Sequence, residues 1–389
     1  SSAASDVYKR QVSMCPLEEV LLGMGLRVQG SDMTESGTVR QLRSQGIDVA
    51  IGHSAENLKD CDLVIRTAAI HDENPEIAGA IARGIPVYER AQAWGAIMQH
   101  YENALCISGT HGKTTTTSMA THIFMAAQAD PTVMIGGTLP LLHSGYRVGR
   151  GDTIILESCE YCNSFLNFFP TVAVILNVHA DHLDFFKDLE DIRHSFHQFA
   201  ALLPSDGTLI INGDIDNYQE IYDSLDCNVI TYGSSDMLDY SASNITYDEK
   251  GLVAFDLIKN GKVVDHIQLS VTGDHNVSNA LASIATAELL QIPMETIKKG
   301  ILSFSGTDRR FEYKGTFNGV TVVDDYAHHP TEIAATLKAA QHYPHNQVWC
   351  VFQPHTYTRT KAFFHEFAEA LSHTDHLVLA DIYAARETD

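Results

Sequence analysis

The sequence predicts an α/β protein built from three domains. Its 389 residues are too many for one ordinary core, because a domain holds about 150 residues on average. Apolar residues at helical spacing alternate along the chain with short apolar runs that are typical of strands. Such alternation favours layers of helices packed on mostly parallel sheets.

Composition excludes several classes of protein. The hydrophobic fraction of 44% and the charged fraction of 19% are those of a globular protein. No apolar run reaches the roughly 18 residues of a membrane span, so we expect no membrane insertion. The net charge of -23 would repel a phosphate backbone, so nucleic acid is not an expected partner. The chain has seven cysteines, which is an odd number, and we find no signal peptide in the sequence. Both observations favour reduced thiols in a cytoplasm.

We predict the first domain over residues 12–101. Its alternating elements are a helix over 17–24, strands over 48–52 and 62–67, a helix over 75–83 and a strand over 85–88. Residues 1–11 have neither the apolar core of a signal peptide nor a periodicity that continues into this domain. We expect them to be foreign or disordered.

We predict a central domain over residues 102–305 and a third domain over 306–389, separated by the small residues 303–307. Expected central elements are strands over 104–108, 153–156 and 172–176, helices over 114–127 and 276–290, and a hairpin turn at 259–262. Expected elements of the third domain are strands over 320–323, 348–352 and 377–380, and helices over 331–341 and 360–371.

A glycine-rich loop follows the strand over 104–108 and precedes a predicted helix. Backbone N–H groups and the helix dipole in this setting face an anion, and a lysine neutralises it. The loop is shorter than the common Gly-x4-Gly-Lys-[Ser/Thr] form. Either Thr114 or Thr115 could supply the hydroxyl on the metal side. The expected phosphate-binding residues are Gly109, Thr110, His111, Gly112, Lys113, Thr114 and Thr115.

Polar residues follow the next two central strands, where an α/β sheet places its ligands. Glu157 ends one strand and is placed to hold a metal. The string over 177–184, which includes His182, ends the other; a solvated loop with helix-capping aspartates is the alternative. Cys159 and Cys162 have the spacing of a redox pair, but the flanking acids would raise the pKa of both thiols.

Asp324-Asp325-Tyr326-Ala327-His328-His329-Pro330 follows a strand of the third domain and precedes a helix. It gathers acids, a phenol and imidazoles at one sheet edge, although an N-capped turn is an equal alternative. Three arginines are candidates for binding phosphate or carboxylate, namely Arg309, Arg310 and Arg359. Surface salt bridges are an equal alternative for them.

Taken in order, these motifs resemble the Mur ligase family from about residue 17 to the last residue. The string over 324–332 points to the member that adds alanine, rather than to relatives that add later amino acids. The matching motifs lie at 30–32, 74–76, 109–116, 157–164, 181–184, 275–280, 309–312, 324–332 and 353–355.

The resemblance implies a fold and an activity. The fold has a Rossmann-like UDP-sugar domain, a central P-loop ATPase domain with a mixed sheet, and a Rossmann-like C-terminal domain that closes over ATP. In the reaction, the lactyl carboxylate of UDP-N-acetylmuramate attacks the γ-phosphate of ATP. L-Alanine then attacks the resulting acyl phosphate.

The resemblance also implies roles for particular residues. Thr114, Glu157 and His182 would serve Mg²⁺, and Asp32 would lie near the uridine. Lys113, His328 and Arg359 would face the reacting centre. The adenosine side would be lined by Asn276, Asn279, Arg310 and Asp324. Which group takes the proton from the amine is not implied.

The sequence departs from the family pattern at both ends. The family begins with a strand and a Gly-x-Gly-Gly-x-Gly-Met loop, where this chain has residues 1–11 and then Val12-Ser13-Met14. The family also continues beyond the position of Asp389, so we expect the first and third domains to be incomplete. Thr356 stands where some members carry a second arginine. A nucleotide-binding fragment without turnover and a P-loop kinase are therefore the alternative functions.

Overall fold

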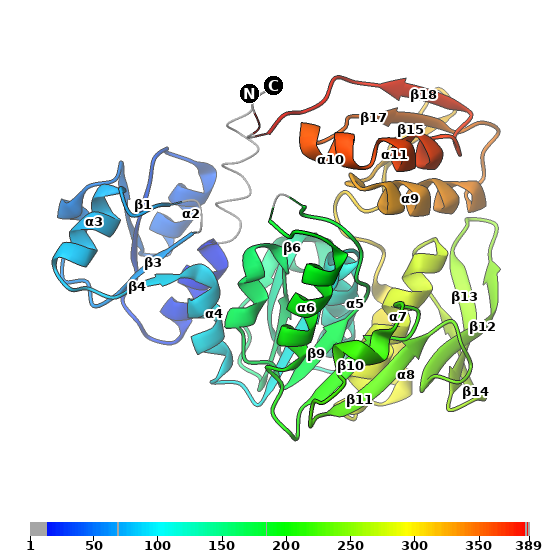
Figure 1. Cartoon of the computed structure of the whole chain (residues 1–389), viewed down its shortest axis with the longest axis horizontal. Coiled ribbons are helices and arrows are strands. Elements are labelled where there is room, and N and C mark those ends of the chain that lie inside the picture. The colour runs from blue at the N-terminus through cyan, green and yellow to red at the C-terminus, as the bar shows by residue number, and fades with distance from the viewer. Residues whose placement is uncertain (1–13, 68–69, 184, 386, 388–389) are drawn as a thin grey trace.

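The computed structural model describes residues 14–67, 70–183, 185–385 and 387. The expectation for residues 1–11 lies outside these ranges, as do Val12, Ser13 and Asp184. The structure has the predicted α/β fold with three groups of elements, which Figure 1 shows at the left, the centre and the upper right. No helix in the described ranges has the length and apolarity needed to cross a bilayer.

The N-terminal group contains two small parallel pairs of strands. Strands β1 and β2 form one pair and β3 and β4 form the other. Ser36 and Asn74 cap α2 and α3 by accepting hydrogen bonds from backbone N–H groups, and Pro75 opens α3. The elements after the helical residues 14–23 are β1 (Gln29–Asp32), α2 (Gly37–Ser44), β2 (Asp48–Ile51), β3 (Val64–Arg66), α3 (Pro75–Ala82), β4 (Val87–Glu89) and α4 (Arg90–Met98).

The central group is a ten-stranded mixed sheet in the order β14-β13-β12-β11-β10-β9-β5-β8-β6-β7. Its strands are β5 (Asn103–Ser108), β6 (Thr132–Leu139), β7 (Ser144–Arg147), β8 (Thr153–Glu157), β9 (Val172–Ile175), β10 (Thr208–Asn212), β11 (Asn228–Gly233), β12 (Tyr240–Tyr247), β13 (Val253–Lys259) and β14 (Lys262–Gln268). The helices are α5 (Lys113–Ala126), α6 (Leu189–Ala200), α7 (Asp274–Leu289) and α8 (Met294–Ser303).

Helices cover both faces of the central sheet. Met119 of α5, Leu281 of α7 and Ile297 of α8 belong to one buried cluster, while Trp94 of α4 and Phe196 of α6 belong to another. This explains why the middle strands are apolar throughout rather than alternating. The predicted hairpin is confirmed, because Lys259 pairs with Lys262 and both turn residues have positive φ.

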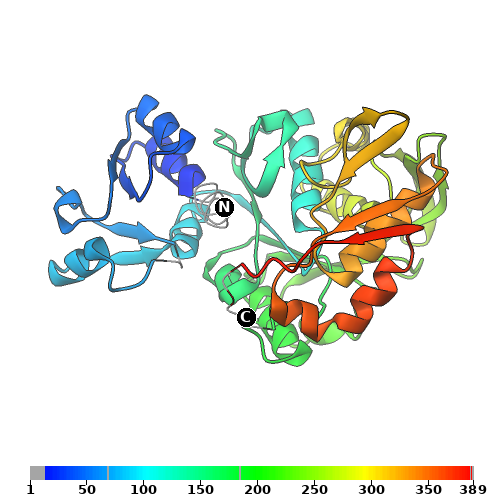
Figure 2. The ribbon, with the colours of Figure 1, turned by 90° about the horizontal axis from the view of Figure 1, so that it is seen from above.

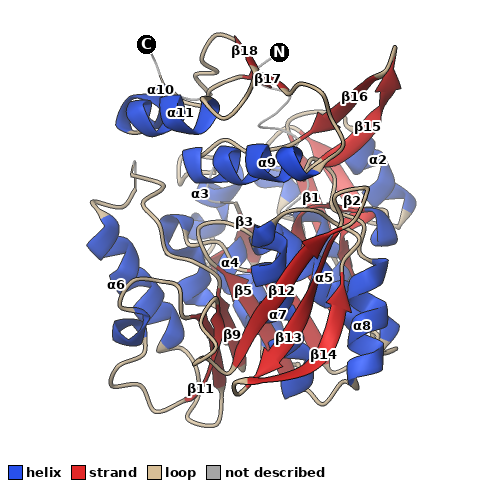
Figure 3. Cartoon of the chain, turned by 90° about the vertical axis from the view of Figure 1, so that its right-hand side faces the viewer, coloured by secondary structure: helices blue, strands red, loops and turns tan. Residues whose placement is uncertain are grey.

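The C-terminal group lies above the central sheet, with α9 nearest to it (Figure 3). It comprises β15 (Glu312–Phe317), β16 (Val320–Asp324), α9 (Pro330–His342), β17 (Trp349–Phe352), α10 (Tyr357–Ala362), α11 (Phe364–Leu371) and β18 (His376–Leu379). The single helix expected over 360–371 is wrong. Phe363 leaves the helical region, with φ -115° and ψ 31°, and its ring packs 4.8 Å from that of His329. This tertiary contact divides the segment into α10 and α11.

Candidate active site

The glycine-rich loop joins the buried strand β5 to helix α5. Gly109 and Gly112 have φ values of 145° and 82°, in the region that favours glycine. A Cβ on Gly112 would lie 2.7 Å from Asn279 Oδ1, so a side chain there would also collide with α7. Asn177 holds the loop, because its Oδ1 accepts a hydrogen bond from His111 N at 2.7 Å. The loop is therefore fixed at a helix N-terminus, where the helix dipole favours an anion.

Lys113, the first residue of α5, folds its side chain over this loop. Its ammonium donates to the carbonyls of Gly109 and Thr110 and, at 2.9 Å, to Glu160 Oε2. The charged side chains of Lys113 and Glu160 are 12% and 2% exposed. Burial alone would lower the pKa of Lys113, but the charges of Glu160 and Glu157 and the hydrogen bond to Glu160 act with other nearby groups to outweigh it and raise the pKa. The ammonium therefore stays charged beside the predicted phosphate site.

Two oxygen donors lie side by side at the start of α5 and the end of β8. Thr114 Oγ1 donates to Glu157 Oε1 at 3.1 Å, and Gly136 N donates to the other carboxylate oxygen at 2.6 Å. Such hard oxygen donors suit Mg²⁺, which keeps its remaining positions for phosphate and water. His182 instead has its Nε2 3.8 Å from Glu160 Oε1. Within the described ranges, no three His, Cys, Asp or Glu side chains gather as a metal cluster.

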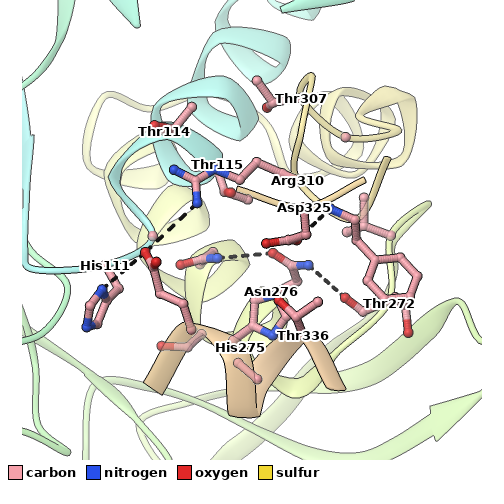
Figure 4. Close-up of a pocket in the computed structure, with 18 of the residues that line it drawn as sticks. His111, Thr114, Thr115, Thr272, His275, Asn276, Thr307, Arg310, Asp325 and Thr336 are labelled. Carbon is pink, nitrogen blue, oxygen red and sulfur yellow. Dashed lines mark hydrogen bonds and ion pairs between the residues drawn. The ribbon is translucent and has the colours of Figure 1, made fainter. Parts of the chain in front are cut away.

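A cavity of about 690 Å³ opens beside the loop, between the central sheet and the C-terminal group (Figure 4). The wall of the cavity does not include three residues of the adjoining loop, namely Gly109, Thr110 and Lys113. The wall includes most of the predicted nucleotide-binding residues, namely His111, Gly112, Thr114, Thr115, Asn276, Asn279 and Arg310.

Polar groups on one wall of this cavity fit a nucleotide base. Asn279 Nδ2 donates to Asn276 Oδ1 at 3.0 Å, and Asn276 Nδ2 donates to the Thr272 carbonyl at 2.7 Å. Thr272 Oγ1 is buried with no hydrogen-bond partner among the described residues. Burial lowers the pKa of His275 to about 4, so its ring is neutral at pH 7. A ligand with both donors and acceptors would satisfy these groups.

The cavity is lined by Asp325 and not by the predicted Asp324. Asp325 Oδ2 accepts a hydrogen bond from Phe311 N at 2.8 Å, and its other oxygen accepts one from Ala327 N at 2.7 Å. Asp324 lies 3.6 Å from Arg309 Nε and its side chain is 41% exposed. Successive side chains at the end of a strand point to opposite sides, which explains why only one of the two faces the cavity.

Arg359, expected at the reacting centre, extends from α10 to the central group. Its Nε and one terminal nitrogen lie 3.2 and 3.1 Å from Asp181 Oδ1. Burial alone would raise the pKa of Asp181, but the charges of His182 and Arg359 outweigh it and lower the pKa to about 2. This buried ion pair therefore joins the C-terminal group to the end of β9.

His328 lies at the same junction. Its Nδ1 is 2.9 Å from the Tyr326 carbonyl oxygen and 3.4 Å from Glu332 Oε2. The second oxygen of Glu332 lies 3.3 Å from His111 Nδ1 and 3.9 Å from an Arg310 nitrogen. Glu332 thus connects α9 to the phosphate loop.

Asp32, expected near the uridine, ends β1 in the N-terminal group. It accepts a hydrogen bond from Thr34 N at 2.9 Å. The neighbouring Ser31 donates to Glu76 Oε2 at 2.6 Å and lies 3.0 Å from His53 Nδ1. Figure 2 shows this group set apart from the elements that line the cavity. The uridine contact stays a prediction.

Several side chains in these contacts received no role from the sequence, among them Asn177, Glu160, Asp181, Asp325 and Glu332. Each belongs to a motif that was recognised, which follows β8, β9 or β16 and, for Glu332, extends into α9. The strings indicated the right loops. They could not indicate which members face inward, because that depends on side-chain direction and on partners far away in sequence.

Three family models match consecutive parts of the chain. The Mur ligase family catalytic domain matches residues 12–102, the Mur ligase middle domain matches 107–287, and the glutamate ligase domain of Mur ligases matches 309–388.

Several similar proteins carry the same name. The chain is 56% identical over 380 residues to a UDP-N-acetylmuramate–L-alanine ligase of Lachnospira eligens, covering 97% of this chain and 83% of the relative. It is 49% identical to the ligase of that name from Clostridium tetani, covering 97% and 83%. The crystal structure of the UDP-N-acetylmuramate–alanine ligase from Thermotoga maritima aligns with a TM-score of 0.79 at 29% identity, covering 96% of this chain and 83% of that one.

Proposed function

Because the chain belongs to the Mur ligase family, we propose that it joins L-alanine to the lactyl carboxylate of UDP-N-acetylmuramate in peptidoglycan precursor synthesis. The reaction consumes ATP and yields ADP, phosphate and an amide. The observation that carries this function is the 56% identity, over 97% of the chain, to a ligase of that name. The phosphate loop and the adjoining cavity supply the site that such a reaction needs.

A carboxylate is a poor electrophile, and phosphorylation by ATP gives it a leaving group. The γ-phosphoryl group moves from ATP to the lactyl carboxylate, and the amine of alanine then displaces phosphate. Lys113, whose ammonium is charged, is placed to offset the charge on the transferred phosphoryl group. Arg359 and His328 would face the reacting centre from the C-terminal group.

The metal, the adenosine and the uridine are each matched to residues whose chemistry suits them. Thr114 and Glu157 would hold Mg²⁺, with His182 as a further ligand, and the metal would neutralise phosphate charge. The adenosine would lie in the cavity against Asn276, Asn279, Arg310 and Asp325. Asp32 would contact the uridine. We place the activity in the cytoplasm of a bacterium, where ATP and reduced thiols are available.

The decisive test measures phosphate release with each substrate omitted in turn. Release should require ATP, UDP-N-acetylmuramate and L-alanine together, and mass spectrometry should find the amide. Lys113→Met should abolish release while the protein remains folded. Release from ATP alone would contradict the proposal. A stable phosphorylated product would indicate a kinase instead, and ATP binding without any product would indicate a fragment without turnover.

A further inference from the structure

The surroundings of His328 fix the position of its ring proton. Nδ1 faces the Tyr326 carbonyl oxygen at 2.9 Å and Glu332 Oε2 at 3.4 Å. A carbonyl and an ionised carboxylate only accept hydrogen bonds, so Nδ1 must carry the proton. Nε2 then carries a lone pair, and no described residue hydrogen bonds to it. The side chain is 29% exposed, so the ring is not enclosed on every side.

Burial keeps this ring neutral, while its carboxylate partner stays ionised. Burial lowers the pKa of His328, and the charge of Arg359 lowers it further, against the opposing charges of Glu332 and Asp181. For Glu332, burial would raise the pKa. The hydrogen bond from His111 and the nearby positive charges outweigh it and hold the pKa well below its ordinary value.

Other groups near the ring come from its own segment and from other parts of the chain. The Tyr326 ring lies 5.2 Å from it and the His355 ring lies 6.2 Å from it. Arg359 reaches Asp181 from α10, and His111 reaches Glu332 from the phosphate loop. The free Nε2 therefore lies where the phosphate loop, the end of β9 and the C-terminal group meet.

The proposed ligation requires a base at this point. L-Alanine exists in water mostly as an ammonium, which has no lone pair to attack an acyl phosphate. We propose that His328 Nε2 takes the proton from the ammonium of L-alanine, and that Glu332 is the positioning residue that orients His328. This inference rests on the proposed ligase function and names the group that activates its nucleophile.

The step balances in protons and electrons. The ammonium gives one proton to His328 Nε2 and becomes a neutral amine, whose lone pair forms the bond to the acyl carbon. The bond from that carbon to the phosphate oxygen breaks, and the phosphate leaves with the electron pair. The second proton lost by the nitrogen goes to the departing phosphate. The imidazolium then returns its proton to water.

Hydroxylamine provides a test, because it is already a neutral amine at pH 7 and needs no base. The assay supplies ATP and UDP-N-acetylmuramate and offers either L-alanine or hydroxylamine to His328→Asn. We expect alanine ligation to fall by about 10²–10⁴-fold, the range for general base catalysis. Hydroxamate formation should fall at least tenfold less, because acyl phosphate formation does not use this base.

His345→Asn is the matched control. Its Nδ1 also faces the carbonyl two residues earlier, that of Tyr343 at 2.6 Å, but the side chain is exposed and pairs with no carboxylate of the described residues. Both activities should match those of the unaltered chain. Equal losses with the two amines in His328→Asn would overturn the base assignment. Failure of the unaltered chain to form hydroxamate from UDP-N-acetylmuramate would instead contradict the proposed function.

The pH profile tests Glu332 separately. Alanine ligation should decline as acid protonates His328, at a pH below the ordinary histidine pKa of about 6.5. Because the charge of Glu332 raises the pKa of His328, Glu332→Gln should move this decline to lower pH, and His328→Asn should remove it. A merely structural role for Glu332 would lower activity without moving the decline, and that result would overturn its assignment.

Discussion

A buried ammonium needs a counter-charge, and the carboxylate of Glu160 provides one for Lys113. Both side chains are nearly enclosed, at 12% and 2% exposure, so water screens their interaction little. Oε1 of Glu160 has no hydrogen-bond partner among the described residues, and His182 Nε2 lies 3.8 Å away. Glu160 therefore links the phosphate loop to the string that follows β9. Its carboxylate holds Lys113 on the loop, and the phosphates of a bound nucleotide would supply a competing anion.

Glu160→Gln would keep the side-chain volume and remove the charge. We expect the free energy of unfolding, measured with urea, to fall by about 3 kcal/mol, because an uncompensated ammonium would remain buried. Saturating MgATP should recover part of this loss by supplying phosphate charge. In a Lys113→Met background the same change should have little effect, since no ammonium remains. An equal loss in both backgrounds would show that the ion pair is not its cause.

At the scale of elements, the sequence predicted several that have a clean period and clear punctuation. The helix after the loop and the hairpin at Lys259 to Lys262 follow from spacing and turn residues. Strand β6 went unpredicted because Gly136 and Gly137 interrupt its apolar run. The structure gives a reason for Gly136, since a Cβ there would lie 2.5 Å from Glu157 Oε1. Local propensity cannot indicate that a glycine is required because a carboxylate distant in sequence packs against it.

The same limit applies to the site. The sequence located the polar strings at the ends of β8, β9 and β16. It did not separate Asp325 from Asp324, or show that Glu332 would meet His111 across 221 positions. Helix α6 is a different case, because it was not predicted although its signals are present in the sequence. Asp188 caps it, and Ile192, Phe196 and Phe199 lie buried on one face at helical spacing, so this helix was predictable from the sequence.

Gly95 in α4 tests how closely the N-terminal group packs on the centre. A Cβ at this position would lie 2.0 Å from the backbone oxygen of Asn167. Gly95→Ala improves helix propensity by up to about 1 kcal/mol. We nevertheless expect a net loss of about 1–3 kcal/mol in urea unfolding, because a backbone oxygen cannot rotate away.

Gly37→Ala serves as the comparison. Its Cβ would meet nothing closer than 3.9 Å, at the flexible end of Arg40, and Gly37 is the first residue of α2. This variant should unfold within about 0.5 kcal/mol of the unaltered chain, as surface substitutions usually do. Equal stability of the two alanine variants would contradict the close packing of α4.

For the whole molecule, the junction above the central sheet brings the two halves of the active site together. Glu332 and Arg359 both cross it, from α9 and α10. Lys338 crosses it to Asp274, and the His342 ring stacks on Tyr247 with centroids 3.8 Å apart. The nucleotide cavity lies between these contacts, with walls from both groups. Binding of ATP should therefore strengthen the junction, and loss of a buried crossing contact should loosen it.

Two ion pairs at this junction differ in burial and should differ in strength. Arg359 and Asp181 are 12% and 7% exposed, whereas Lys338 and Asp274 are 65% and 40% exposed. Breaking a buried pair costs about 3–5 kcal/mol, whereas an exposed pair contributes about 0–1 kcal/mol. Asp181→Asn should therefore open the junction far more often than Lys338→Met does.

Hydrogen exchange in α10 and α11 measures this opening. A loss of about 3 kcal/mol corresponds to exchange that is roughly 100-fold faster in Asp181→Asn, where opening exposes these helices. Lys338→Met should accelerate exchange less than about fivefold. Saturating MgATP should slow exchange in Asp181→Asn, because a nucleotide in the cavity would contact walls from both groups. If the two variants exchanged equally fast, the buried pair would not be what holds the C-terminal group over the phosphate loop.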